Sequence, residues 1–227
     1  LRLDVSDNDS IFDAAGNPLG GPGAGNGDYT GGESYAIDQT PPTVALSSAA
    51  PDPTNAAPIP VTVAFSEDVT GFTLSDIVVT NGTASDWAQV TPKDYTFNLH
   101  PAGQGDVSAQ IPAGVAFSLA GNGNQPGSFH VVYDSLPPTT TLLGDPYVYV
   151  NQNQTYTDAG AEAFDNIDGD VSANILIDTG DVDTTRAGVY TVRFNVTDKA
   201  GNPAAEVTRT VEVIAPPEVP ISPWPVA

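Results

Sequence analysis

Two segments built around a double proline lie 96 residues apart and divide the chain into units. Asp38–Val44 and Asp134–Thr140 both carry an Asp, two intervening residues, two prolines and a Thr. Proline has no amide hydrogen to donate to a β-ladder, so the pair suits a short rigid linker before an edge strand. The spacing is close to the length of one two-layered β-sandwich. The chain is therefore predicted to contain modules of this size in tandem.

The tripeptide Ala-Gly-Asn occurs three times, at Ala15–Asn17, Ala120–Asn122 and Ala200–Asn202. Each copy precedes a segment that suits a closing strand, and Gly-Asn supplies the positive φ angle that a tight loop requires. The order of loop, last strand, linker and next module thus recurs along the chain, which is typical of a tandem array.

These signals predict four parts. The boundaries are 1–39, 40–135, 136–215 and 216–227. The first part is interpreted as the C-terminal remnant of a module whose opening strands lie upstream. A lone hairpin is marginally stable in water, so we expect this remnant to pack on a neighbour or to be mobile. The two middle parts are long enough for complete sandwiches, and the proline-rich last part suits an extended tail.

Composition favours β-structure and excludes several classes of protein. The 227 residues include 24 Val and 23 Thr, which suit strands, and 43 Gly and Pro, which mark turns. A net charge of −22 argues against nucleic-acid binding. No apolar run reaches the roughly 20 residues of a membrane span. Because the chain has no cysteine, disulfides, thiolate metal sites and cysteine nucleophiles are excluded.

Apolar and polar residues alternate in several short runs, which is typical of half-buried strands. The runs are Val61–Phe65, Tyr95–Leu99 and Val107–Ile111. In the last module the alternation places Tyr190, Val192, Phe194 and Val196 on one side of a strand. Tyr190 is either a tyrosine corner or a simple core tyrosine. The pattern predicts an all-β chain of tandem immunoglobulin-like (Ig-like) antiparallel β-sandwiches with a partial N-terminal module.

Two stretches resemble bacterial Ig-like modules. Residues 138–214 resemble the HYR or pesticidal-crystal-protein type, through the motifs Thr155–Ala161, Asp165–Asp170, Gly188–Val192 and Val196–Asn202. Residues 41–134 resemble a second bacterial Ig-like class, through Val63–Val69 and Ile111–Val115. The resemblance implies the sandwich fold and a setting in large secreted or surface-attached bacterial proteins, as stalks and adhesin segments. Such motifs specify the fold better than the function, because this fold hosts many roles.

The densest acidic cluster is Asp165–Asp170, with the sequence Asp-Asn-Ile-Asp-Gly-Asp. It is not an EF-hand, because Phe164 would take the first ligand position and no helix flanks the loop. Asp165, Asp168 and Asp170 remain candidates for a simpler Ca²⁺ site, since Ca²⁺ accepts six to eight oxygens in irregular loops. The alternative is a turn in which the Asp and Asn side chains bond their own backbone.

The module junctions are the other candidate sites. Asp38 and Asp134 adjoin the linker prolines, where a cation could bind loops of both neighbours and stiffen the joint. Glu67 and Asp68 could add oxygens to such a junction. Cadherins and the repeats of many large adhesins use Ca²⁺ in this way, although the cadherin linker pattern Asp-x-Asn-Asp-Asn is absent here. The alternative is a dry hinge stiffened by proline.

Signals of catalysis are weak. His100 and His130 are not spaced as metal ligands, no Gly-x-Ser-x-Gly elbow occurs, and the glycines from Gly16 to Gly32 match no phosphate loop. We therefore expect the chain not to be an enzyme. Trp87 is interpreted as a core residue, whereas an exposed Trp87 would suggest a sugar-binding platform.

The expected function is a non-catalytic extracellular spacer, stalk or adhesin region of a bacterial surface protein. Its expected partners are neighbouring Ig-like modules and an extracellular ligand that the sequence does not identify, and Ca²⁺ is the expected ion. Two alternatives remain open. One is an accessory or carbohydrate-binding region of a secreted polymer-degrading enzyme. The other is a self-assembling element of a surface layer or filament, in which a strand from another chain completes the first module.

Overall fold

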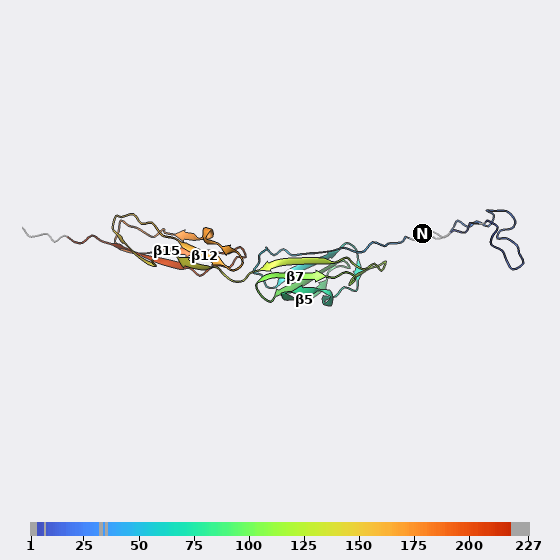
Figure 1. The fold of residues 1–227 in the computed structure, drawn as a ribbon, viewed down its shortest axis with the longest axis horizontal. Coiled ribbons are helices and arrows are strands. Elements are labelled where there is room, and N and C mark those ends of the chain that lie inside the picture. The colour runs from blue at the N-terminus through green and yellow to red at the C-terminus, as the bar shows by residue number, and fades with distance from the viewer. Residues whose placement is uncertain (1–3, 7, 32–33, 35, 219–227) are drawn as a thin grey trace, which may run out of the picture.

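A computed structural model describes residues 4–6, 8–31, 34 and 36–218. The described part is nearly all β-structure, with sixteen strands, the short 3₁₀ helices η1 (Leu74–Asp76) and η2 (Ser172–Asn174), and no α-helix. Figure 1 shows two strand-rich bodies lying end to end, with an N-terminal segment that extends beyond them. The predicted all-β, tandem Ig-like fold is confirmed.

The first sandwich holds nine strands. They are β1 (Val44–Ser47), β2 (Ile59–Phe65), β3 (Val69–Thr70), β4 (Val78–Thr80), β5 (Gly82–Gln89), β6 (Asp94–Pro101), β7 (Gly105–Ile111), β8 (Phe117–Ser118) and β9 (Gly127–Tyr133). One sheet has the order β1-β2-β6-β5 and the other the order β4-β7-β9, while β3 pairs with β8. All of these pairings are antiparallel.

Alternation along the strands builds the core of the first sandwich. On β2 the residues Ile59, Val61, Val63 and Phe65 are buried, and those between them are exposed. The predicted runs on β6 and β7 bury their apolar residues in the same way. Trp87 is partly buried against this core, with its ring 5.5 Å from that of Tyr95. This packing favours the core interpretation of Trp87 over a sugar platform.

The second sandwich holds seven strands. They are β10 (Thr139–Leu142), β11 (Tyr147–Asn151), β12 (Ala161–Asp165), β13 (Gly169–Asp170), β14 (Leu176–Asp178), β15 (Gly188–Asn195) and β16 (Val207–Ile214). The sheets have the orders β10-β12-β13 and β11-β16-β15-β14. β11 runs parallel to β16, because the chain crosses from one sheet to the other between β10 and β11 and so lies beside the closing strand.

The core of the second sandwich follows the predicted face of β15. Val192 and Phe194 are fully buried, and Tyr190 packs against the cluster that they form. Val196 is buried just beyond the strand. The Tyr190 hydroxyl donates a hydrogen bond of 2.9 Å to the carbonyl of Arg186, four residues earlier. This bond from the start of the strand to the upstream backbone is the tyrosine corner that the sequence left open.

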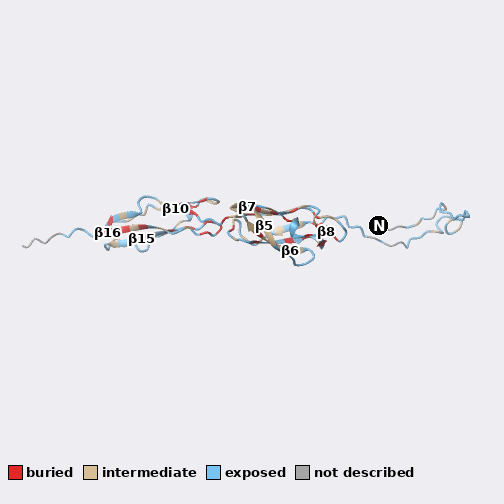
Figure 2. Ribbon diagram, turned by 90° about the horizontal axis from the view of Figure 1, so that it is seen from below, coloured by how far each residue is buried: buried red, intermediate tan, exposed pale blue. Residues whose placement is uncertain are grey.

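The N-terminal segment forms no β-ladder among its described residues. It holds two isolated bridges, Val5 to Tyr29 and Phe12 to Pro18. Nearly all of its side chains are exposed, as the pale blue of the segment in Figure 2 shows. At the other end, residues 215–218 lie outside the strands, and the rest of the predicted tail, 219–227, falls outside the described residues.

A candidate metal centre between the two sandwiches

A five-residue linker, Asp134–Pro138, joins the last strand of the first sandwich to the first strand of the second. At its start, the Asp134 amide donates to the carbonyl of Thr54 (2.8 Å), and the Thr54 amide donates to that of Val132 (2.9 Å). These bonds fix the loop before β2 against the end of β9. The first sandwich therefore presents one ordered pole, formed by this loop and Asp134, to its neighbour.

Asn202 of the second sandwich contacts this pole at two points. Its Nδ2 donates to the backbone carbonyl of Asp134 (2.9 Å), and its Oδ1 accepts a hydrogen bond from Asn55 Nδ2 (3.0 Å). Asn202 belongs to the third Ala-Gly-Asn copy, and Gly201 adopts the positive φ of 94° that the tripeptide predicted. One loop of the second sandwich thus holds both the linker and a loop of the first.

Three aspartates converge beside this contact. Asp134 follows β9, Asp165 ends β12, and Asp198 lies in the loop after β15. Their relative exposures are 0, 2 and 7%, and one carboxylate oxygen from each lies within 4.8 Å of the other two. In the described part of the chain this is the one group of three or more acidic or histidine side chains arranged in this way.

Local turns position the three carboxylates. Asp165 Oδ1 accepts hydrogen bonds from the amides of Ile167 (2.7 Å) and Asp168 (2.9 Å), and Asp134 Oδ1 accepts one from Leu136 (3.2 Å). Both are turns in which an Asp side chain bonds the backbone two or three residues ahead.

Asp198 is held differently. Its two oxygens accept hydrogen bonds from the amide (2.7 Å) and the Nδ2 (2.8 Å) of Asn202. Asn202 therefore bonds both the main-chain carbonyl of Asp134 and the carboxylate of Asp198, and so fixes the positions of two of the three aspartates.

Two oxygens of the group are left over. Asp134 Oδ2 and Asp165 Oδ2 are buried and have no hydrogen-bond partner among the described residues. None of the three aspartates forms an ion pair with a described lysine or arginine, because the nearby Lys199 pairs with Asp168 instead (3.0 Å). Burial raises the pKa of Asp134, and the charges of Asp165, Asp198 and Asp168 raise it further. The cluster is therefore a concentration of acidic groups in a buried place.

This donor set suits a hard cation. All three side chains offer carboxylate oxygens, and Ca²⁺ binds oxygens at about 2.3–2.6 Å, so two ligands of one ion can stand up to about 5 Å apart. The spread of the three oxygens fits within that limit.

The structure brings together some of the predicted metal ligands. Asp134 and Asp165 belong to the cluster. Asp168 lies beside it, but its carboxylate is bonded to the amide (2.7 Å) and the ammonium group of Lys199. Asp170 is exposed and accepts hydrogen bonds from the hydroxyl (2.6 Å) and amide (2.9 Å) of Ser172, which lower its pKa.

The other three predicted ligands lie at the opposite pole of the first sandwich. The amide of Gln125, just before β9, donates to the carbonyl of Pro42, so β9 starts at this pole and ends at Asp134 on the other. Asp38, Glu67 and Asp68 are not part of the three-aspartate group, and a cation there stays a prediction. The Asp38 carbonyl accepts a hydrogen bond from Asn122 Nδ2 (3.0 Å), which repeats the bond from Asn202 to Asp134.

Asp198 and Asn202 were not among the predicted site residues, although the sequence held a signal for them. In two of the three Ala-Gly-Asn copies an Asp stands four residues before the Asn, as in Asp13 and Asn17. Asp13 accepts hydrogen bonds from the amide and the Nδ2 of Asn17, both at 2.9 Å, just as Asp198 does from Asn202. The middle copy has Ser118 at this place.

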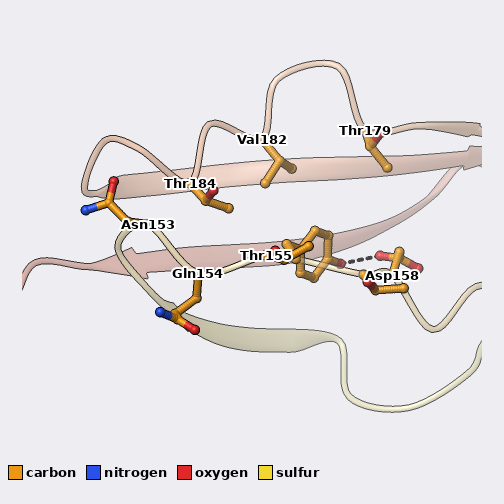
Figure 3. A pocket seen from close by; sticks show the side chains of 9 residues that line it. Asn153, Gln154, Thr155, Asp158, Thr179, Val182 and Thr184 are labelled. Atoms are coloured by element: carbon orange, nitrogen blue, oxygen red, sulfur yellow. Dashed lines mark hydrogen bonds between the residues drawn. The ribbon is translucent and has the colours of Figure 1, made fainter.

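A pocket lies at the end of the second sandwich that faces away from the joint. Figure 3 shows it between two loops, with Asn153, Gln154 and Thr155 on one and Thr179 and Thr184 on the other. Asp158, which also lines it, is bonded to the Tyr156 hydroxyl and to Arg209. The contacts of this carboxylate are therefore structural.

Comparison with known protein families matches the two sandwiches separately. Residues 140–213 match the family described as a bacterial surface protein Ig-like domain, and residues 38–134 match a bacterial Ig-like domain. The chain therefore contains two bacterial Ig-like domains in tandem. The HYR or pesticidal-crystal-protein type, which the motifs of the second Ig-like domain resemble, stays a prediction. In the described part of this Ig-like chain no helix is long and apolar enough to cross a membrane.

Individual relatives are distant. An uncharacterized 81.3 kDa protein of Acholeplasma phage L2 is 31% identical over 155 residues, which cover 66% of this chain and 19% of that protein. The chain thus spans about a fifth of the length of this relative.

Three solved structures are also similar. The lipoprotein BT2262 from Bacteroides thetaiotaomicron has 25% identity and a TM-score of 0.32, covering 37% of this chain and 41% of its own. The Escherichia coli adhesin FdeC has 14% identity and a TM-score of 0.38, and the match covers 81% of this chain and 66% of that chain. The N-terminal part of the bacterial S-layer protein SbsC has 12% identity and a TM-score of 0.30, and the match covers 76% of this chain and 44% of that chain. At these TM-scores the likenesses carry no conclusion about function.

Proposed function

We propose that this chain is a spacer or stalk segment of a bacterial surface protein, in which Ig-like domains are held end to end. The observation that carries the proposal is the double contact of Asn202 with Asp134 and Asn55 across a five-residue linker. A linker this short, with bonds on both sides of it, restricts how the second domain can turn relative to the first.

The path of the chain supports the same function. The chain enters the first domain at the pole near Pro42 and leaves it at the opposite pole, at Asp134. Domains connected in this way add their lengths, as the elongated outline in Figure 1 illustrates. Because each domain touches only its neighbours, reach grows with the number of domains. The match of the second domain to the Ig-like domains of bacterial surface proteins fits a place outside the cell.

A distance measurement across the joint tests this proposal. The chain has no cysteine, so spin labels can be attached at two exposed positions, by Ser128→Cys on β9 and Thr208→Cys on β16. Pulsed electron paramagnetic resonance should give one narrow distance distribution. Asn55→Ala should broaden it, because the variant removes the contact with Asn202 and leaves the three aspartates intact.

Asn122→Ala is the matched control. It removes the equivalent asparagine bond at the pole of the first domain that faces away from the joint. The distribution should therefore stay narrow in this variant. A broad distribution in the parent protein, both with Ca²⁺ and with a chelator, would mean that the domains turn freely and that the chain is not a stiff spacer.

A further inference from the structure

We propose that Asp134, Asp165 and Asp198 form a Ca²⁺ site that fastens the two Ig-like domains together. The mechanical role of this ion rests on the spacer function proposed above, whereas its binding does not. Two features of the cluster carry the inference, namely its unpartnered buried oxygens and its composition from both domains.

The unpartnered oxygens are the first argument. A buried polar atom normally has a hydrogen-bond partner, and a buried charge normally has a counter-charge. Asp134 Oδ2 and Asp165 Oδ2 have no partner among the described residues, although both side chains are almost completely buried. Three carboxylates within 4.8 Å also repel one another. A divalent cation coordinated by both oxygens removes both penalties.

Lys199 does not supply that charge. It directly follows Asp198 in the sequence, but its ammonium group lies on Asp168 (3.0 Å), and its side chain is largely exposed. Asp168 thus neutralises Lys199. The three buried aspartates keep a net negative charge for which a bound ion is the remaining partner.

The donor atoms favour Ca²⁺ over other metals. The group contains no histidine or cysteine, which argues against zinc and copper. Its ligands come from the linker, the end of β12 and the loop after β15. Ca²⁺ tolerates such irregular geometry and takes six to eight oxygens, whereas Mg²⁺ demands a near-ideal octahedron. Water and backbone carbonyls would complete the shell.

The site spans the joint. Asp134 belongs to the first domain, whereas Asp165 and Asp198 belong to the second. Asn202 is a positioning residue, because it bonds both the Asp198 carboxylate and the Asp134 carbonyl. An ion bound to all three acids therefore fixes the linker against two loops of the second domain, and the joint stiffens when Ca²⁺ binds.

The test is a Ca²⁺ titration of the full chain by calorimetry, together with thermal unfolding in Ca²⁺ and in chelator. We expect one bound ion per chain and a higher Tm in Ca²⁺, since an ion that binds only the folded state stabilises it. Asp165→Asn should weaken binding at least tenfold and abolish the shift in Tm. Asp170→Asn, in the same loop but bonded to Ser172, is the matched control and should behave as the parent.

Folding of the variants is measured separately. Asp165→Asn keeps the shape of the side chain and removes one of three repelling charges, so in chelator its Tm should equal or exceed that of the parent. Asp198→Asn provides a second variant that should also lose Ca²⁺ binding, but its Tm in chelator should fall, because an amide nitrogen cannot accept the hydrogen bond that Asn202 Nδ2 donates to Asp198. If the parent chain binds no Ca²⁺ and its Tm is unchanged, the carboxylates share protons instead and the proposal is wrong. Equal losses in Asp165→Asn and Asp170→Asn would also refute it.

The spin-label pair separates this proposal from the spacer function. Narrowing of the distance distribution by Ca²⁺ in the parent, but not in Asp165→Asn, is the expected result. A distribution that is narrow with or without Ca²⁺, in a chain that binds no ion, would support the spacer function and refute the metal site. Binding of Ca²⁺ without any narrowing of the distance distribution would support the metal site and refute its mechanical role.

Discussion

Arg209 is buried on the inward face of β16, with a relative exposure of 1%. Its guanidinium group bonds the carbonyls of Asp145 (2.9 Å) and Leu143 and the carboxylate of Asp158, and it lies 5.6 Å from the ring centre of Phe194. The contacts with Asp145 and Leu143 hold the segment that crosses between the sheets of the second domain. This arginine therefore fixes the turn from β10 to β11.

Replacing Arg209 should destabilise the second domain strongly. Arg209→Met leaves Asp158, whose side chain is only 9% exposed, without its counter-charge, and breaking a buried ion pair costs about 3–5 kcal/mol. Arg193→Met is the control, because the pair of Arg193 and Glu206 (2.7 Å) is exposed and such pairs contribute about 1 kcal/mol or less. Urea unfolding of both variants measures the difference. Equal effects would mean that the buried pair does not support the fold.

The sequence predicted two of the three cluster residues. Asp134 was visible as the acid before a double proline, and Asp165 as the start of the densest acidic run. Asp198 lies 33 residues beyond Asp165, and only the packing of two loops brings the pair together. Arg209 was not predicted either, because a charged residue at an inward position looks like a break in the apolar pattern.

The strands were predictable to the extent that alternation marks them. On β2, β6, β7 and β15 one face is buried and the other faces solvent, so the period of two is visible in the residues. β14 carries no such signal, because all three of its residues are exposed at the edge of a sheet. The parallel pairing of β11 with β16 arises because the chain passes from one sheet to the other between β10 and β11, and no periodic pattern in the sequence marks this passage.

The three Ala-Gly-Asn loops share one backbone design. In each loop the glycine amide donates to the carbonyl three residues earlier: Gly16 to Asp13, Gly121 to Ser118 and Gly201 to Asp198. All three glycines have positive φ angles, of 84°, 87° and 94°. The repeated tripeptide thus encodes a loop that presents an asparagine at the same place each time.

Gly121→Ala should destabilise the first domain by about 1–2 kcal/mol, the cost of holding a residue with a Cβ in the left-handed region. An added Cβ meets no atom within 4 Å at this position, so the loss reflects backbone strain alone. Gly103→Ala is the control, since Gly103 lies outside the left-handed region and its Cβ would make only an ordinary contact. We expect that control to change the unfolding free energy by less than about 0.5 kcal/mol. Similar losses in the two variants would contradict the argument.

At the scale of the whole molecule, two complete sandwiches are connected in series, with entry and exit at opposite poles of the first. Pulling on the two ends should therefore load the domains one after the other. Single-molecule force measurements should show two unfolding events, which release residues 38–134 and 140–213 at roughly 3.3–3.6 Å of length per residue. The N-terminal segment, whose described residues hold only isolated bridges, should extend without an event of its own. A single event, or a third of equal force, would contradict this organisation.

The bond from Asn202 ends on the main-chain carbonyl of Asp134 in the preceding domain, and the bond from Asn122 likewise ends on a main-chain carbonyl, that of Asp38. Every amino acid has such a carbonyl, so this half of the coupling works whatever side chain the neighbour offers. Only the carboxylate half requires aspartate at defined places. Duplication or exchange of whole domains in a gene would therefore preserve this main-chain bond, while the response to ions could be gained or lost by changing a single codon.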